Sequence, residues 1–443
     1  MPLTLPQLFF RNSNWVFVEK LSKAVVTGLV SILVARYLGS DGLGKVSIVI
    51  TIYTIFSMFS TLGLERVLLK ELSEKKIKVN TLIGGALLIR AISACIGIVL
   101  INTGSIFYFS DSHNIQLMIA VVSTALLLAI GNVFEVFYRY TLRSQVVAAI
   151  RLAGLLLAAF TKLLIIFFDA DIIWFSVAVV LETLLISICY TFAIRKEEGS
   201  ISITQLDFSL TEGKRLFKYS WPLILSGLVG TLYFHLDKLL IYSYLDESSL
   251  GRYALLVQVV SITLFLFAAL NMSAIPILNS LYQKNKQLYW EKYQEVTALK
   301  FLISILLVLP FILFGSDMIA FLAGDEFKYE TKLMVSFSCY ITLVSIGALK
   351  TEHCVLIGLT KPILVIRIIS LTTNFIFNFI LIPTLGLFGA AIATVISYGV
   401  NEFIAPMLYK DMRIALKNEL LALKKIISPE FYKNLKHITK KAL

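Results

Sequence analysis

Twelve apolar segments, each long enough to cross a lipid bilayer as a helix, dominate this sequence. About 20 apolar residues span the roughly 30 Å hydrocarbon core. The 443-residue chain is 58% hydrophobic and 15% charged, whereas about a quarter of an ordinary globular protein is charged. This composition excludes a soluble nucleic-acid-binding protein, even at a net charge of +12. The segments are 14–37, 45–65, 80–101, 114–137, 145–168, 172–194, 220–244, 252–280, 296–315, 331–357, 363–382 and 387–409. We therefore predict an all-α integral membrane protein with twelve transmembrane helices.

Basic residues are distributed very unequally between the predicted loops. Lysine and arginine accumulate in loops on the cytoplasmic side of a membrane. One alternate set of loops holds 28 basic residues, and the other set holds only Lys328. Both termini are therefore predicted to be cytoplasmic. The basic set is 1–13, 65–80, 138–151, 195–218, 282–300, 358–362 and 410–443.

A long polar connection divides the predicted spans into two groups of six. We expect an N-terminal lobe over 1–200, a cytoplasmic linker over 201–219, a C-terminal lobe over 220–409 and a basic tail over 410–443. Within the tail, apolar residues alternate with lysines over 412–427. This pattern predicts an amphipathic helix that lies on anionic lipid.

A short internal repeat supports the division into two lobes. Tyr37-Leu38 is followed, after four residues, by Leu43-Gly44-Lys45, and Tyr244-Leu245 by Leu250-Gly251-Arg252 at an offset of 207 residues. Six spans separate the two copies, so both have the same orientation. Parallel repeats of this kind are common in transporters, where the substrate path lies between the halves. We expect two parallel-repeat six-helix lobes around a central cavity.

Motifs for catalysis and for cofactor or metal binding are not found. The sequence has no G-x-x-x-x-G-K-[ST], H-E-x-x-H, G-x-S-x-G or C-x-x-C. Asp169-Ala170-Asp171 has the D-x-D spelling of metal-dependent sugar transferases, but it falls in a three-residue turn between spans, where aspartates that cap helices are the better interpretation. We expect no catalytic residue, no metal and no cofactor, and therefore not an enzyme.

Polar residues inside the spans are the candidate functional groups, since an ionisable side chain in hydrocarbon normally faces a bundle interior or a watery cavity. Several of them fall on single helix faces, which predicts a hydrated, positively charged lumen and an anionic substrate. Arg90 and Glu182 lie deep in their spans, and an alternative is that they form a buried ion pair within the N-terminal lobe. Lys20, Arg151 and Arg367 lie near the cytoplasmic interface, where they could instead extend to lipid headgroups. The predicted substrate-binding residues are Lys20, Lys23, Arg90, Asp237, Lys238, Arg367, Asn374 and Asn378.

Two segments resemble a known family. Ala35-Arg36-Tyr37-Leu38-Gly39 and Gly386-Leu387-Phe388-Gly389-Ala390-Ala391 are similar to the first and last signatures of bacterial polysaccharide-repeat flippases. These are the O-antigen (Wzx-type) transporters of the multidrug/oligosaccharidyl-lipid/polysaccharide (MOP) exporter superfamily. The resemblance implies a bacterial inner-membrane transporter that moves an undecaprenyl-pyrophosphate-linked oligosaccharide to the outer leaflet by alternating access. It also implies membrane lipids and other polysaccharide assembly proteins as partners, and no nucleic acid.

The sequence does not by itself identify the coupling ion, and it allows two alternative functions. Glu19, Glu65 and Asp237 are acidic groups that could couple the cycle to H⁺ or Na⁺. A cation-coupled multidrug exporter of the same superfamily is the nearest alternative, although such a pump should prefer acidic lumen residues. A polysaccharide polymerase or transferase is a further alternative, which the short predicted outer loops disfavour.

Overall fold

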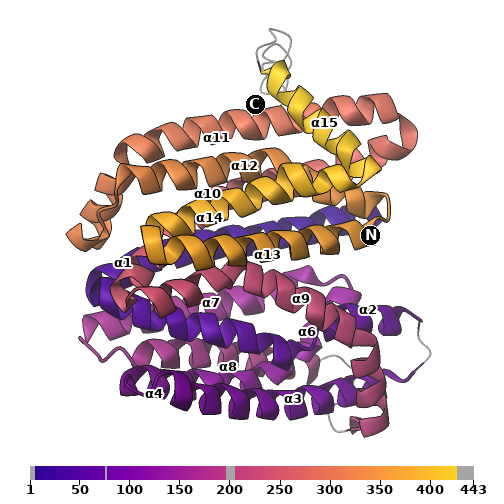
Figure 1. Cartoon of the computed structure of the whole chain (residues 1–443). Coiled ribbons are helices and arrows are strands. Elements are labelled where there is room, and N and C mark those ends of the chain that lie inside the picture. Colours follow the sequence, from indigo (N-terminus) through magenta and orange to yellow (C-terminus); the bar gives the residue numbers. More distant parts are fainter. Residues whose placement is uncertain (1–4, 75–76, 196–204, 427–443) are drawn as a thin grey trace. The chain divides into compact units, whose positions relative to one another are not determined.

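The computed structural model describes residues 5–74, 77–195 and 205–426, and it contains helices but no strand in these ranges (Figure 1). The chain divides into two compact units, Met1–Leu239 and Leu240–Leu443. The predicted linker lies partly outside the described residues, and its described part includes the beginning of a long helix that continues through the seventh predicted span. The exact lobe boundary at 201–219 therefore stays a prediction.

Unit 1 is built from helices whose apolar faces enclose a common core. Its core contains the buried residues Leu64, Leu68, Phe137 and Tyr190. The helices are α1 (Leu5–Thr61), α2 (Leu64–Glu74), α3 (Val79–Tyr108), α4 (His113–Ser123), α5 (Ala125–Leu128), α6 (Val133–Tyr140), α7 (Ser144–Phe167), α8 (Trp174–Arg195) and most of α9 (Leu210–Tyr244), with a 3₁₀ turn at Ala129–Asn132.

Unit 2 continues with longer helices. They are α10 (Glu247–Lys284), α11 (Lys286–Ala323), α12 (Thr331–Leu356), α13 (Thr360–Leu385), α14 (Leu387–Gly399) and α15 (Lys410–Lys425). Short 3₁₀ turns occur at Asp325–Phe327 and Ala405–Leu408. The last membrane helix changes from α to π geometry over Val400–Ile404. A π turn inserts an extra residue into a helix and is frequent at functional sites.

The predicted spans are confirmed by helices of suitable length. Eleven helices in the described chain are long and apolar enough to cross a membrane. The first of them holds two predicted spans, because α1 runs through a kink at Gly39, whose φ of 66° is outside the helical region. The fourth predicted span is broken into α4, α5, the 3₁₀ turn and α6. Twelve spans are thus accounted for.

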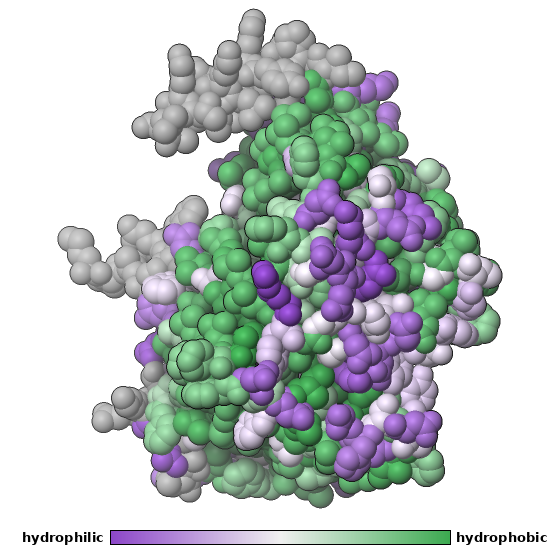
Figure 2. Space-filling view, turned by 90° about the vertical axis from the view of Figure 1, so that its left-hand side faces the viewer, coloured by the Kyte–Doolittle hydropathy of each residue, from purple (hydrophilic) through white to green (hydrophobic). Residues whose placement is uncertain are grey.

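Large apolar side chains are exposed over much of the surface. Phe107, Phe167 and Phe321 are about 80% exposed, and Figure 2 shows broad hydrophobic areas with polar residues gathered in patches. Contiguous apolar surface of this extent is rare on soluble monomers and marks a membrane contact. The protein is therefore a multi-pass membrane protein.

Helix α15 lies where the amphipathic helix of the tail was predicted, and one of its sides contacts protein. One side of α15 packs against α11 and α12. Ile414, Leu420 and Leu421 of α15 are exposed, and contact of this other side with anionic lipid stays a prediction. The buried residues of α15 are Met412, Ala415, Leu416, Glu419 and Ala422. The rest of the predicted tail lies outside the described residues.

Gly389, in the first turn of α14, packs closely against α13 and gives a prediction about stability. A Cβ atom added at Gly389 would overlap the carbonyl oxygen of Leu381, a backbone atom that cannot move without shifting α13. Gly389→Ala should therefore lower the free energy of unfolding by about 1–3 kcal/mol. Gly399→Ala is the matched control, since no atom lies within 4 Å of its Cβ position. Thermal unfolding of the purified protein in detergent checks this, and equal midpoints for the two variants would contradict it.

Candidate functional site

A chain of alternating charges connects four helices of unit 1. Arg139 on α6 lies 2.6 Å from Glu65 of α2 and 2.6 Å from Glu135 of its own helix. Arg151 on α7 lies 2.9 Å from the other oxygen of Glu135 and 3.8 Å from Glu19 of α1. Glu135 is the centre of this ion chain, because it pairs with both arginines and only 8% of its side chain is exposed.

Local sequence explains part of this arrangement. Glu135 and Arg139 are four residues apart, so they lie on the same face of α6. Arg151 donates from Nε to Oε2 of Glu135 and from Nη2 to Oε1, which is the bidentate geometry that suits a carboxylate. A carboxylate buried at this depth is stable only when it is paired and hydrogen-bonded. The ion chain therefore fixes α1, α2, α6 and α7 relative to one another.

A polar cavity of about 130 Å³ lies beside the ion chain. Three carboxylates and two bases line it, and the Oδ1 atom of Asn132 is buried there without a hydrogen-bond partner in the described chain. The cavity is large enough for several water molecules or a small cation and far too small for an oligosaccharide. Its lining residues are Glu19, Lys23, Asn132, Glu135, Arg151, Leu152, Leu155, Glu182 and Ile186.

The structure brings together only some of the predicted site residues of unit 1. Glu19 and Lys23 both line the polar cavity. Lys20 is exposed on α1, and Glu65 is held by Arg139 at the far end of the ion chain. The cavity also has acidic lining residues, and of these Glu19 was among the acidic groups predicted from the sequence, whereas Glu135 was not.

Arg90 is buried, and its contacts differ from the alternative in which it pairs with Glu182. Its guanidinium donates to the carbonyl oxygens of Ser60 at 2.8 Å and Ala129 at 3.1 Å. These carbonyls lie near the end of α1 and in the 3₁₀ turn, where helical hydrogen bonding is interrupted. Arg90 thus satisfies carbonyl groups at two helix breaks, whereas Glu182 faces the polar cavity.

Asp237 and Lys238 lie next to each other at the end of unit 1. The Asp237 carboxylate accepts a hydrogen bond from the backbone amide of Lys238 at 2.8 Å, and both residues are half-buried. Their predicted contact with substrate stays a proposal.

Of the predicted site residues on α13, Arg367 differs in exposure from Asn374 and Asn378. Arg367 is exposed. Asn378 donates to Asn374 at 3.0 Å, and Asn374 donates to Ser397 of α14 at 3.3 Å. Both asparagines are at most 3% exposed. They connect α13 to α14, and binding of substrate by them would require this interface to open.

A buried charge cluster in unit 2 was not predicted from the sequence. Lys350 of α12 lies 3.2 Å from Glu402 in the π turn and 3.0 Å from Glu419 of α15. Tyr293 of α11 donates to Glu419 at 2.9 Å, and Lys300 is fully buried nearby. Burial raises the pKa of Glu419, and Lys350 opposes this shift. Lys350 and Glu402 fall within predicted apolar spans, and this was the signal available in the sequence.

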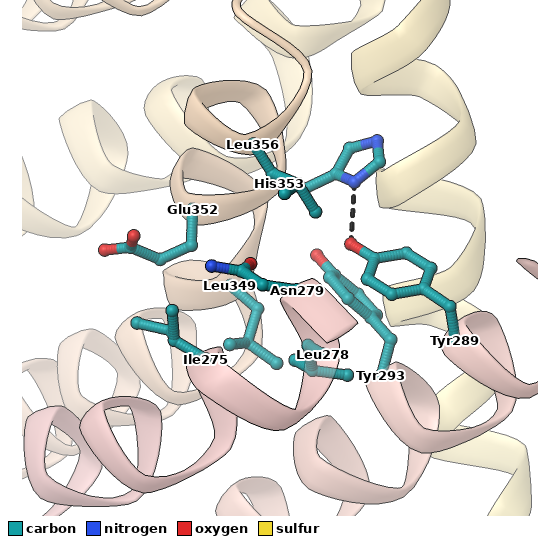
Figure 3. Close-up of a pocket in the computed structure, with 9 residues that line it drawn as sticks. All are labelled: Ile275, Leu278, Asn279, Tyr289, Tyr293, Leu349, Glu352, His353 and Leu356. Atoms are coloured by element: carbon teal, nitrogen blue, oxygen red, sulfur yellow. Dashed lines mark hydrogen bonds between the residues drawn. The ribbon is translucent and has the colours of Figure 1, made fainter. Parts of the chain in front are cut away.

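A small cavity adjoins this buried charge cluster (Figure 3). Tyr293 lines it, and the Tyr289 hydroxyl group lies 2.7 Å from Nδ1 of His353 across it. Its volume is about 10 Å³, which is close to the minimum for one water molecule. The cavity is therefore part of the packing that supports α15 and is too small to be a substrate site.

A family model described as polysaccharide biosynthesis protein matches residues 32–332, which is more than half of the chain. The chain belongs to this family. The match includes both units and all four helices of the ion chain, apart from Glu19, which precedes it.

Two curated proteins are similar to this polysaccharide biosynthesis family protein. The capsular polysaccharide biosynthesis protein CapF of Staphylococcus aureus is 22% identical over 90% of this chain and 98% of its own. The probable low-salt glycan biosynthesis flippase Agl15 of Haloferax volcanii is 28% identical over 44% of this chain. The matched region spans only 41% of Agl15.

Solved structures establish the fold class of this family member. The lipid II flippase MurJ in an inward closed conformation has a TM-score of 0.73 at 14% identity, over 92% of this chain and 91% of MurJ. An inward-facing multidrug resistance MATE family transporter of the MOP superfamily has a TM-score of 0.66, also at 14% identity, over 91% of this chain and 96% of that one. The protein thus has the MOP transporter fold, as its sequence resemblance implied.

Proposed function

We propose that this protein is a flippase that moves an undecaprenyl-pyrophosphate-linked oligosaccharide across the bacterial cytoplasmic membrane by alternating access. The observation that carries the proposal is the family match over both units, to proteins of polysaccharide biosynthesis. The name of CapF refers to capsular polysaccharide, and those of Agl15 and MurJ refer to flippases. The loop charges support an orientation with both termini in the cytoplasm.

Charged residues within the membrane helices have separate proposed roles. Lys20, Lys23 and Lys238 would bind the pyrophosphate, whose transfer through bare hydrocarbon would be prohibitively costly. Glu19 is the proposed coupling carboxylate, since it faces a cavity that can hold water or a small cation. Asp237 is a second proposed coupling group. Glu65 is a weaker one, because Arg139 already neutralises it.

Deletion of the gene in its own organism tests the proposed function. Surface polysaccharide should disappear, and oligosaccharide repeats linked to undecaprenyl pyrophosphate should accumulate on the cytoplasmic side of the membrane. The wild-type gene on a plasmid should restore both. Normal surface polysaccharide in the deletion strain would contradict the proposal.

The same strain separates the two transporter functions. The MATE structures share the fold, so a multidrug exporter is the second candidate. A multidrug exporter predicts increased drug susceptibility with unchanged polysaccharide. A flippase predicts unchanged drug susceptibility and loss of surface polysaccharide.

The proposed cation assignment gives a further prediction. Lys23→Ala/Lys238→Ala should lower the rate of polysaccharide export at least 10-fold, because each lost charge-assisted hydrogen bond costs about 1.5–3 kcal/mol. Lys78→Ala/Lys417→Ala makes the same charge change at exposed positions and should export normally. Export is measured in the complemented deletion strain at matched protein levels. A normal rate in the first variant would refute the assignment.

A further inference from the structure

A second, larger polar groove lies at the basic end of unit 1. It has a volume of about 600 Å³ and is formed by α2, by Ile77 in the connection between α2 and α3, and by the N-terminal part of α9. This volume is within the range of pockets that hold small ligands. The groove is lined by Arg66, Val67, Lys70, Glu71, Glu74, Ile77, Arg215, Tyr219 and Leu223.

Buried packing and one anchored arginine hold the groove open. The apolar side of α2, including Leu68, packs into the same core as Leu216 of α9. Arg215 lies 2.8 Å from Glu71 and 2.7 Å from Glu212. Its guanidinium also lies 5.7 Å from the ring centre of Tyr219. Arg215 is therefore occupied in positioning α9 and Tyr219 against α2.

Two bases on α2 remain available to a ligand. Arg66 and Lys70 are four residues apart, so they are on the same helix face, and both are exposed. Arg66 forms no ion pair within the described part of the chain. Lys70 is 73% exposed and lies 3.8 Å from Glu74, and an exposed ion pair of that length contributes little.

The other lining groups complete a recognisable binding surface. Tyr219 is 59% exposed, so its ring is open to a flat ligand surface such as a sugar face. Leu223 and Val67 provide an apolar floor. Two adjacent cations, an open aromatic ring and an apolar floor suit a sugar that carries a pyrophosphate, since guanidinium groups match phosphate oxygens.

We propose that this groove captures the sugar-pyrophosphate headgroup of the lipid-linked substrate before it is translocated. The proposal rests on the proposed flippase function. The loop charges place residues 65–80 and 195–218 on the predicted cytoplasmic side, where such a substrate would arrive. Arg66 and Lys70 would bind the two phosphates, Tyr219 would stack on the first sugar, and the apolar floor would receive the start of the prenyl chain.

Binding is tested with the full chain in nanodiscs, using a short-chain polyprenyl-pyrophosphoryl N-acetylglucosamine as the probe. Arg66→Ala/Lys70→Ala should raise its dissociation constant at least 10-fold. Lys78→Ala/Lys214→Ala is the matched control, because it removes two exposed lysines from the same end of unit 1 outside the groove. Equal dissociation constants for the two double variants would overturn the proposal.

The sugar contact has its own test. Tyr219→Ala should weaken binding of this probe several-fold but leave binding of a prenyl pyrophosphate without sugar unchanged. Tyr219→Phe keeps the ring and should bind the probe like the wild type. Equal weakening of both ligands by Tyr219→Ala would contradict sugar stacking.

Competition for the bound probe distinguishes a lipid-linked sugar pyrophosphate from a soluble nucleotide sugar and from an ordinary phospholipid. UDP-N-acetylglucosamine carries the pyrophosphate and the sugar but lacks the prenyl chain, so it should displace the probe less effectively than unlabelled probe at the same concentration. Phosphatidylglycerol in the nanodisc should not displace it, because it lacks the pyrophosphate and sugar. Displacement by phosphatidylglycerol, or displacement by UDP-N-acetylglucosamine as effective as that by unlabelled probe, would overturn the assignment to a lipid-linked sugar.

Transport measured with the same variants separates this proposal from the proposed function. If the wild type moves the lipid-linked sugar and Arg66→Ala/Lys70→Ala moves it equally well, the groove proposal fails and the flippase proposal stands. If the wild type does not move it, the flippase proposal itself fails.

Discussion

Lys350→Met is expected to lower the free energy of unfolding of this protein by about 3–5 kcal/mol. Lys350 is the cation between Glu402 and Glu419, and its side chain is only 4% exposed. Methionine removes the charge but keeps most of the volume, so both carboxylates would be left buried without their cation. Breaking a buried ion pair in this way is strongly destabilising. The thermal midpoint of the protein in detergent is the measurement.

Lys417→Met on α15 is the control for this prediction. Lys417 is exposed and forms no ion pair within the described residues, so its replacement should change stability by no more than about 0.5 kcal/mol. If the two methionine variants unfold at the same temperature, the buried charge cluster does not hold α15 to the other helices of unit 2.

The second large effect is expected at the centre of the ion chain in unit 1. Glu135→Gln should cost about 3–5 kcal/mol, because Arg139 and Arg151 both lose the buried carboxylate that pairs with them. Transport should fall as well, since Glu135 lines the polar cavity.

Glu65→Gln is a control within the same ion chain. Glu65 also pairs with Arg139, but 49% of its side chain is exposed. Water can replace its contact, and the expected cost is therefore at most about 1 kcal/mol. Similar losses in Glu135→Gln and Glu65→Gln would mean that burial does not determine the strength of the ion chain.

Much of the fold was predictable from the sequence, because bilayer thickness imposes a fixed length on apolar helices. The twelve segments correspond to helices, and the break at Gly39 falls in a predicted turn. Asp171 accepts a hydrogen bond from the amide of Ile173 in the turn that precedes α8. Each of these features depends on residues that are close in sequence.

The candidate sites were less predictable, because they depend on contacts between distant residues. Arg151 was expected to face headgroups or a lumen; it lines the polar cavity and binds Glu135, a partner that was not predicted from the sequence. Arg90 bonds to carbonyl groups exposed by helix breaks, and no side-chain pattern indicates such breaks. Lys350 and Glu419 belong to different predicted regions, one in a span and one in the tail.

Transport of a lipid-linked sugar by the purified protein tests the central claim most directly. Vesicles would carry a fluorescent polyprenyl-pyrophosphoryl oligosaccharide in both leaflets, with a glycosidase added outside. Without the protein, digestion should stop when the outer leaflet is consumed, at about half of the substrate. With the wild-type protein and an imposed H⁺ or Na⁺ gradient, we expect digestion to proceed nearly to completion. Digestion that stops at the same level as in protein-free vesicles, under both gradients, would contradict the account.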